Sequence, residues 1–394
     1  MNKKKESKVV PNVRFKGFTD DWKQRKLSEI ADKVTEKNAG LQYIETFTNS
    51  AEFGIISQRD FFDHDIAKMS SLGGYYIVRN DDFVYNPRIS TSAPVGPINR
   101  NKLGRTGVMS PLYTVFRPHD VDITYLEYFF KSKYWNSFMN FNGDSGARSD
   151  RFSIKDSVFF EMPIPLPYIE EQRKIGDHLT QLDHLITLHQ QKITLLTKLK
   201  KTMLEKMFPK KGSLIPEIIF NGFANAWEQR KLGDEAEEIL AGGDIDKEKA
   251  VDDGVYPIYA NALTNDGIVG YYDDYYRVKA PAVTVTGRGE IGRARARMID
   301  FTPVVRLLAV RSNHDCYFLE NAINNHKVVV ESTGVPQLTV PQLSSYDICF
   351  PKDIVEEKKI GTYFNQLDHL ITLHQRKLDM LKKLKSACLS AMFI

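Results

Sequence analysis

One ten-residue sequence, QLDHLITLHQ, occurs twice in this chain of 394 residues, at residues 181–190 and again at residues 366–375. A second motif, F-x-G-F-x-x-x-W-x-Q-R-K-L, begins at Phe15 and again at Phe220. The residues between these repeated pieces do not match. The chain is therefore expected to hold two copies of one architectural plan that carry two different globular bodies.

Both copies of the ten-residue repeat lie in long stretches, residues 171–208 and 356–393, where apolar side chains recur every three or four positions. This spacing predicts two amphipathic helices, each somewhat over roughly 50 Å long. An apolar stripe of that length needs a partner, and the simplest partner is the other copy, paired antiparallel with an internal pseudo-two-fold repeat. The predicted seam and subunit-docking residues are Leu182, Ile186, His189, Ile193, Leu196, Leu367, Ile371, His374, Leu378 and Leu381.

His189 and His374 occupy equivalent positions on this predicted seam. A polar seam residue fixes the register of paired helices at some cost in stability, and we favour this role for both imidazoles. A metal site or a pH-sensitive contact is the alternative.

The two globular bodies are predicted to mix strands with helices. Over residues 40–117, short β-branched and aromatic runs alternate with Gly, Pro and Asn clusters, and residues 123–139 have helical spacing. The duplicated aromatic motif marks the start of each body, with Gln24, Arg25 and Lys26 in an exposed turn. The predicted class is α+β: two mixed α/β domains, residues 1–169 and 211–354, separated by two long antiparallel coiled-coil helices, residues 170–210 and 355–394.

Composition excludes several classes of protein. With 42% apolar and 26% charged residues, the chain is an ordinary globular protein rather than a disordered or collagen-like one. No apolar stretch reaches the roughly 20 residues that span a membrane. The Lys-rich start is not followed by the apolar core of a signal peptide, so we expect a cytoplasmic protein. Cys316, Cys349 and Cys388 are isolated, which favours core thiols over a disulfide or zinc site. Because the net charge is only +4, a nucleic-acid surface would need local clusters of cations.

The second body contains a glycine pattern typical of dinucleotide sites. Gly287, Gly289 and Gly292 follow a strand-like run, but an alternating segment follows them where a Rossmann fingerprint needs a helix. Arginines on a strand beside a glycine turn are placed to contact phosphates or guanine edges. A solvated strand face is the alternative. The candidates for DNA contact here are Arg288, Arg293, Arg295 and Arg297.

The first body has a comparable stretch of cations, hydroxyls and amides on predicted loops. Such side chains form most phosphate and base contacts, although they are also ordinary loop residues. The candidates for DNA contact in this stretch are Arg88, Ser90, Thr91, Ser92, Arg100, Lys102 and Arg105.

Catalytic motifs are weak in this sequence. The triplet from Asn86 to Arg88 lacks the second proline and the aromatic ring of an amino-methyltransferase motif. Asp353 and Glu357 with the following lysines only crudely imitate a nuclease site, and acids at that position suit the start of a helix. No Ser/His/Asp, Cys/His or zinc-protease constellation is evident. We therefore expect a chain that is not itself an enzyme.

The layout as a whole resembles the specificity (S) subunit of type I restriction-modification systems, the HsdS family. The resemblance covers essentially the full chain. It rests on the duplicated aromatic motif, on the two acidic and basic helix starts at residues 170–175 and 356–360, and on the repeated QLDHLITLHQ. Each motif is weak by itself, but their duplicated order is specific.

The resemblance implies that each body is a target recognition domain for one half of a divided, asymmetric DNA site. The helices would set the spacer and dock two modification subunits, which bind S-adenosylmethionine and methylate adenine. Restriction subunits, which use Mg and ATP, would join that core, and this chain would hold no cofactor. A loop before each proline-rich exit, residues 146–152 and 334–338, would lie near the DNA, which makes Arg148, Arg151 and Gln337 further candidates.

Two other functions stay open at this point. One is a self-contained DNA methyltransferase or nuclease, which would bind S-adenosylmethionine or cut DNA alone. The other is a coiled-coil scaffold without DNA contact, whose binding would be indifferent to salt, whereas phosphate contacts weaken steeply with ionic strength.

Overall fold

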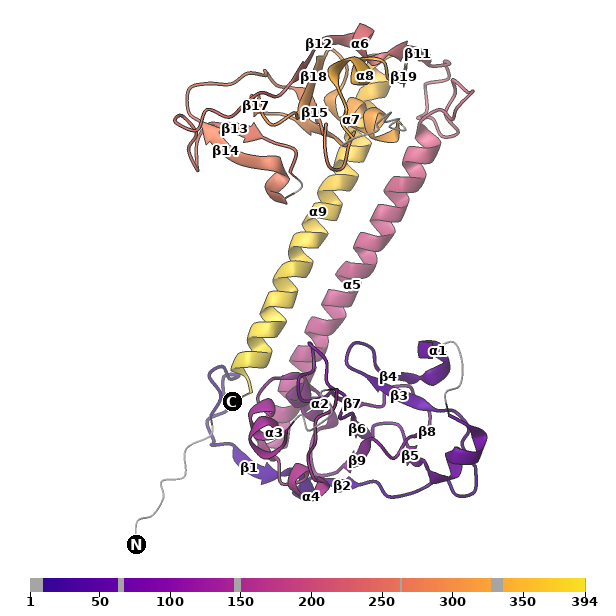
Figure 1. Ribbon diagram of the computed structural model, residues 1–394, viewed down its shortest axis with the longest axis vertical. Coiled ribbons are helices and arrows are strands. Elements are labelled where there is room, and N and C mark those ends of the chain that lie inside the picture. The colour runs from indigo at the N-terminus through magenta and orange to yellow at the C-terminus, as the bar shows by residue number, and fades with distance from the viewer. Residues whose placement is uncertain (1–9, 63–66, 145–149, 263, 327–335, 394) are drawn as a thin grey trace. The chain divides into compact units, whose positions relative to one another are not determined.

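A computed structural model describes residues 10–62, 67–144, 150–262, 264–326 and 336–393 (Figure 1). The chain forms two compact units, one of residues 1–188 with 378–394 and the other of residues 189–377. Two long helices supply parts of both units: α5 (Ile169–Met207) and α9 (Ile354–Ala391). Each unit therefore combines one globular domain with segments of both helices.

The first domain is built on a four-stranded sheet in the order β2-β9-β6-β7, whose strands are all antiparallel to their neighbours. Among the described residues, the β3-β4 hairpin, the two-stranded sheet of β5 and β8 and four short α-helices complete it. The sheet strands are β2 (Ala31–Lys33), β6 (Phe83–Tyr85), β7 (Ile98–Arg100) and β9 (Thr114–Pro118). The other elements are β3 (Phe47–Ser50), β4 (Gly54–Ser57), α1 (Gln58–Phe62), β5 (Tyr76–Val78), β8 (Gly107–Met109), α2 (Ile123–Lys131), α3 (Asn136–Asn142) and α4 (Asp156–Phe159).

The second domain has a sheet of the same connectivity, in the order β12-β18-β15-β16 and again antiparallel throughout. Its strands are β12 (Ala236–Ala241), β15 (Ala282–Val285), β16 (Ala294–Arg297) and β18 (Leu308–Ser312). The other elements are α6 (Leu232–Glu235), β13 (Tyr256–Tyr259), β14 (Ile268–Tyr272), β17 (Thr302–Pro303), α7 (Cys316–Asn325) and α8 (Val340–Ser344). The two domains differ in sequence, but each has its own four-stranded sheet with the same connectivity. The predicted class of two mixed α/β domains is confirmed.

The duplicated aromatic motif opens each domain, but not quite as predicted. Trp22 and Trp227 are buried, as expected for rings that anchor a core. The segment predicted as an exposed turn, Gln24 to Lys26, is instead part of strand β1 (Lys23–Lys26), which pairs with β10 (Pro163–Leu166). Its side chains are exposed while its backbone is hydrogen-bonded. The run of charged residues therefore did not show the alternation of polar and apolar side chains by which a strand is usually predicted. In the second domain, β11 (Glu228–Lys231) pairs with β19 (Asp347–Phe350) in the same way.

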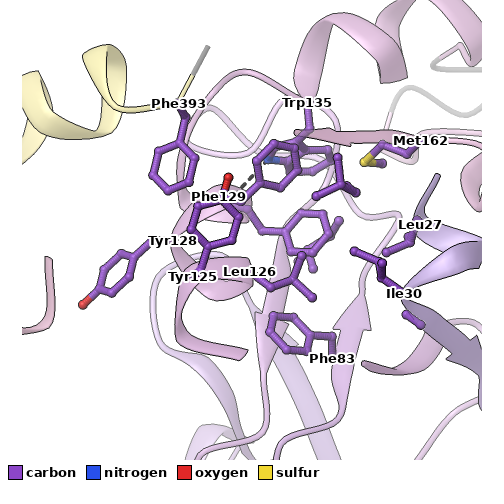
Figure 2. Packing of buried hydrophobic residues seen from close by; sticks show 14 of the residues in the cluster. Leu27, Ile30, Phe83, Tyr125, Leu126, Tyr128, Phe129, Trp135, Met162 and Phe393 are labelled. Carbon is purple, nitrogen blue, oxygen red and sulfur yellow. Dashed lines mark hydrogen bonds between the residues drawn. The ribbon is translucent and has the colours of Figure 1, made fainter. Parts of the chain in front are cut away.

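The end of each long helix fills the core of a domain. At the end of α9, Phe393 is 2% exposed and its ring centroid lies 5.3 Å from that of Tyr125 and 6.1 Å from that of Phe129 (Figure 2). At the end of α5, Phe208 packs at 5.5 Å against Phe318 in the second domain. The first domain therefore depends on residues from the far end of the chain.

Within each unit, segments of the two helices run antiparallel and contact each other. In the first unit Lys385 donates a hydrogen bond to Asp183. In the second unit Lys200 donates to Asp368 at 2.7 Å, and the Nδ1 atoms of His189 and His374 lie 2.8 Å apart. All ten predicted seam residues are buried or half-buried, as the three-and-four spacing requires.

Each domain is also fastened to the start of its long helix at a helix cap. Asp122 caps α2, and its backbone N–H donates to the side-chain oxygen of Gln172 on α5 at 2.8 Å. Asp315 caps α7, and its backbone N–H donates to Glu357 on α9 at 3.2 Å. The two hydrogen bonds occupy equivalent positions in the two domains, but the acceptor is the neutral amide of Gln172 in the first and the carboxylate of Glu357 in the second.

Candidate nucleic-acid interface

Three segments converge at the same place in both domains. The first is the stretch after the central strand β6 or β15, and the second is the turn before the strand β9 or β18. The third is the loop that leads to the proline-rich exit. In the first domain Phe152 N–H donates to the Pro87 carbonyl at 2.7 Å, and in the second Leu338 N–H donates to the Gly287 carbonyl at 2.9 Å. These two hydrogen bonds place the third segment beside the first in each domain.

The turn before the next sheet strand is also equivalent in the two domains. Tyr113 N–H donates to the Ser110 carbonyl and Leu307 N–H to the Val304 carbonyl, both at 3.1 Å. Together with the sheet registers, these bonds define three matched positions. Arg88 corresponds to Arg288, Leu112 to Arg306, and Arg151 to Gln337.

In the first domain these segments line a cleft of about 460 Å³. Its walls include Pro87, Leu112, Tyr113 and Arg151. Leu112 is 60% exposed. Arg88 is exposed beside the cleft, and its backbone N–H is fixed by the Asn86 side chain at 2.9 Å. The cleft thus presents a cation, an apolar side chain and an aromatic ring to solvent.

In the second domain the three segments are locked by closer contacts. Arg306 donates a hydrogen bond to the side-chain oxygen of Gln337. Val305 and Arg306 have φ of 50° and 63°, a conformation that costs energy in residues other than glycine. Gly287 is required here, because a Cβ atom would lie 2.5 Å from the Arg306 carbonyl oxygen. Asn261 holds the arrangement, since it accepts from Gly287 N–H at 2.9 Å and donates to the Val305 carbonyl.

Three predicted contact residues of the first domain are engaged in ion pairs. Arg100 is bonded to Asp81 and to Glu127, and Lys102 is also bonded to Glu127. Burial raises the pKa of the Glu127 carboxyl, but nearby Lys131 and Lys102 lower it by more, so the net pKa shift is downward and the group is ionised. A buried anion that needs these cations gives Arg100 a structural role. Arg105 forms a two-fold hydrogen bond to Glu45 at 2.8 Å on an exposed part of the domain.

The hydroxyl cluster of the first domain lies on the stretch that follows Arg88. Ser90, Thr91 and Ser92 are exposed, and the Ser90 hydroxyl accepts from Ala93 N–H at 3.2 Å to close a turn. Arg148 lies outside the described residues. Two of the predicted contacts, Arg88 and Arg151, are brought together at the cleft, because their backbones form an isolated bridge.

The arginines that follow the glycine turn divide into structural and exposed side chains. Arg297, predicted as a DNA contact, is 7% exposed, donates to Asp266 at 2.6 Å and to Thr284 at 3.0 Å, and stacks on Tyr259. Arg297 supports the sheet and is not available to a ligand. The prediction of a DNA contact at Arg297 is therefore wrong, because the alternation along a strand does not show which of its arginines is buried by tertiary contacts. Arg295 is exposed and paired with Asp266 at 2.8 Å.

Arg293 and Arg288 are the other exposed cations of this region. Arg293 is paired with Glu290 at 2.9 Å and lies before the start of β16. Arg288 is exposed in the glycine turn itself. Within the described ranges, its guanidinium forms no ion pair.

Sequence reasoning missed two members of the site, Leu112 and Arg306. Neither belongs to a basic or glycine-rich stretch, and the turns that carry them differ in sequence between the domains. Their only common signal is position, directly before the sheet strands β9 and β18.

No candidate metal centre accompanies the interface in the part of the chain that the structure describes. There, no cluster of three or more His, Cys, Asp or Glu side chains is placed to hold a metal ion. The three cysteines are free thiols, and burial raises the pKa of each. Among the described helices, none combines the length and the apolar character that crossing a bilayer requires.

Comparisons with known proteins agree with this architecture. A protein of Mycoplasma pneumoniae described as a type I specificity subunit is 25% identical over 355 residues, which cover 86% of this chain and 85% of that protein. A Methanocaldococcus jannaschii protein described as the MjaX specificity subunit is 26% identical over 263 residues, 59% of each chain. The crystal structure of the type I restriction-modification S subunit from M. genitalium has the same fold, with a TM-score of 0.66, 14% identity, and coverage of 98% of this chain and 99% of that chain.

A match to a protein-family model shows that this similarity reflects membership of a family. The type I restriction modification DNA specificity domain matches this chain twice, over residues 19–198 and 225–383. Each match contains one four-stranded sheet with its three converging segments and one long helix start. Two copies of this domain account for nearly the whole sequence, and the chain belongs to the family of type I restriction-modification DNA specificity subunits.

Proposed function

We propose that this chain selects the DNA target of a type I restriction-modification complex, and that each domain reads one half of a divided, asymmetric site. The observation that carries the proposal is the repeated three-segment edge. Both domains build it with equivalent backbone hydrogen bonds, while two of its three matched side chains differ. A frame that is held constant while its exposed side chains vary is suited to reading two different sequences.

The reading surface in each domain combines an exposed arginine with a second polar or charged group. Arginine and glutamine side chains form bidentate hydrogen bonds with base edges in the major groove. Exposed arginines also position a protein on the phosphate backbone. The edges around Arg88 and Arg288 provide both kinds of contact.

The long helices are proposed to dock two modification subunits and to set the spacer between the half-sites. Beside the buried seam, each helix carries exposed apolar side chains at positions that correspond in the two repeats. These residues are Leu185, Leu188 and Leu195 on α5 and Leu370, Leu373 and Met380 on α9. Exposed apolar stripes on soluble helices mark contact surfaces, and two equivalent stripes fit two copies of one partner.

In this proposal the chemistry resides in the partners. The modification subunits would bind S-adenosylmethionine and methylate adenine, and the restriction subunits would use Mg and ATP. The chain itself would act in the cytoplasm as a non-catalytic subunit that binds double-stranded DNA. A solved structure concerned with complex assembly of a type I system has a TM-score of 0.51 to this chain at 15% identity.

The test is genome-wide methylation mapping by single-molecule sequencing. A host without adenine methylation would express this chain with its modification subunit, and a matched culture would express the modification subunit alone. We expect a new asymmetric motif in two parts with a fixed unspecified gap, found only with both chains. If the purified complex assembles yet no motif arises, the chain is a scaffold rather than a reader.

A further inference from the structure

We infer that the matched positions divide the work of recognition: Arg88 and Arg288 make the same sequence-independent phosphate contact, whereas Arg151 and Gln337 select different bases. Arg151 would read guanine in one half-site, and Gln337 would read adenine in the other. This inference rests on the proposed function, because it assigns roles within the surface that reads DNA.

The phosphate role follows from what the two domains share. Arg88 and Arg288 are the same residue type, at the same position after the central sheet strand, and both are exposed. A contact that is needed whatever the base sequence is expected to be alike in both readers. Each backbone position is also fixed, by Asn86 in the first domain and by the Leu338 bond to Gly287 in the second.

The base-reading role follows from what differs. Arg151 and Gln337 both directly precede the residue whose N–H bonds to the first segment, so their side chains leave equivalent backbone positions. A guanidinium matches the two acceptors of guanine, O6 and N7, whereas a glutamine amide matches the N6 donor and N7 acceptor of adenine. The exchange of Arg for Gln at one position therefore changes the base that fits.

The neighbouring matched position supports this difference. In the second domain Arg306 donates to the Gln337 side-chain oxygen, which orients the amide, and the second lone pair of that oxygen still accepts from adenine. Arg306 is thus a positioning residue for Gln337. The first domain has Leu112 at this position, which offers Arg151 no polar partner and presents an apolar surface suited to a thymine methyl group.

The experiment exchanges the readers and removes the anchors in the complex with the modification subunit. Arg151→Gln and Gln337→Arg are each mapped for methylation motif and measured for affinity. We expect each to change the preferred base at one position of one half-site, from guanine to adenine and from adenine to guanine, and to leave the other half unchanged. Discrimination at that position should shift by about five- to 150-fold.

Arg88→Ala and Arg288→Ala should behave differently. Loss of one phosphate contact weakens binding to all sequences alike and reduces the slope of log affinity against log salt by about 1. The methylated motif should stay the same. Lys133→Ala and Lys279→Ala, exposed lysines that belong to none of the three segments, serve as matched controls and should change neither quantity.

The outcomes separate this inference from the proposed function. If the unaltered chain yields no two-part motif, the proposed function is wrong. If it yields one and both reader exchanges leave every base preference intact, the inference alone is overturned, as it also is if Arg88→Ala changes a base preference. For a variant that methylates nothing in cells, affinity for duplexes substituted one base at a time decides, and an unchanged preference counts against the inference.

Discussion

The packing of Phe393 predicts that the end of the chain stabilises the first domain and not the second. Phe393 is 2% exposed and contacts Tyr125 and Phe129 on α2. Replacement of a buried phenylalanine by alanine costs about 3–5 kcal/mol, because transfer energy is lost and a cavity remains. That is a large part of the roughly 5–15 kcal/mol that stabilises a typical domain. We therefore expect Phe393→Ala to loosen the first domain severely.

The matched control is Phe208→Ala, which removes the equivalent ring from the second domain. Phe208 is 5% exposed and packs on Phe318 of α7. Amide hydrogen exchange followed by mass spectrometry reports each domain separately. At about 1.4 kcal/mol for each tenfold change, Phe393→Ala should speed exchange in α2 by a hundredfold or more, and Phe208→Ala should do the same in α7.

Either of two results would refute this reasoning. Unchanged exchange in α2 of Phe393→Ala would show that the ring contributes little to the core. Faster exchange in α7 but not in α2 would show that the end of α9 does not belong to the first domain.

Four further predictions follow from single contacts. Burial lowers the pKa of His314, but its hydrogen bonds to Glu357 and Glu235 raise it by more, so the pKa in the folded chain lies above the usual value. The stability that protonated His314 contributes is therefore complete below about pH 6.5, and it is lost as the pH rises through the higher folded-state pKa. Measured relative to exchange in α2, which is fastened by neutral Gln172, exchange in α7 should therefore quicken from pH 6 to pH 9 in the natural chain and not in His314→Gln. Arg297→Ala should destabilise the second domain by about 3 kcal/mol and Arg295→Ala by about 1 kcal/mol or less, since only Arg297 is buried; equal losses in thermal unfolding would contradict this. Gly361→Ala should cost about 1–2 kcal/mol because its Cβ would lie 2.0 Å from the Asp315 carboxylate that caps α7, whereas Gly176→Ala, whose Cβ would lie 3.1 Å from Thr124, should cost less; equal losses in thermal unfolding would contradict this. Leu188→Glu with Leu373→Glu should abolish binding of the modification subunit in a pull-down without changing unfolding temperature, and retained binding would move the docking surface elsewhere.

The repeats made the architecture predictable from sequence. Two identical decapeptides fixed the positions of the long helices, whose apolar spacing extends over many turns and is insensitive to local context. Strands in the first domain were also predictable, from short β-branched and aromatic runs that alternate with Gly, Pro and Asn clusters. The predicted helix over residues 123–139 is broken into α2 and α3, because the chain turns at Ser132, whose N–H and hydroxyl cap α2.

The details of the interface were less predictable, because they depend on partners distant in sequence. Arg297 is hydrogen-bonded to Asp266, 31 residues away, and Arg100 to Glu127, 27 residues away. Such pairings decide whether a charged side chain has a structural role or is available to a ligand, and they cannot be read from the local sequence. The match between Leu112 and Arg306 is likewise set by sheet register and one turn hydrogen bond, and no similarity of residues reveals it.

The central claim is that each domain carries its own half of the target specificity. The most direct test is a chain in which residues 23–166 are replaced by a second copy of residues 228–350, bounded by the paired strands that open and close each domain. Methylation mapping of this chain with the modification subunit should give a target whose two halves have the same sequence, equal to one half of the natural target. Two halves that still differ, from a complex that assembles and methylates, would contradict the account.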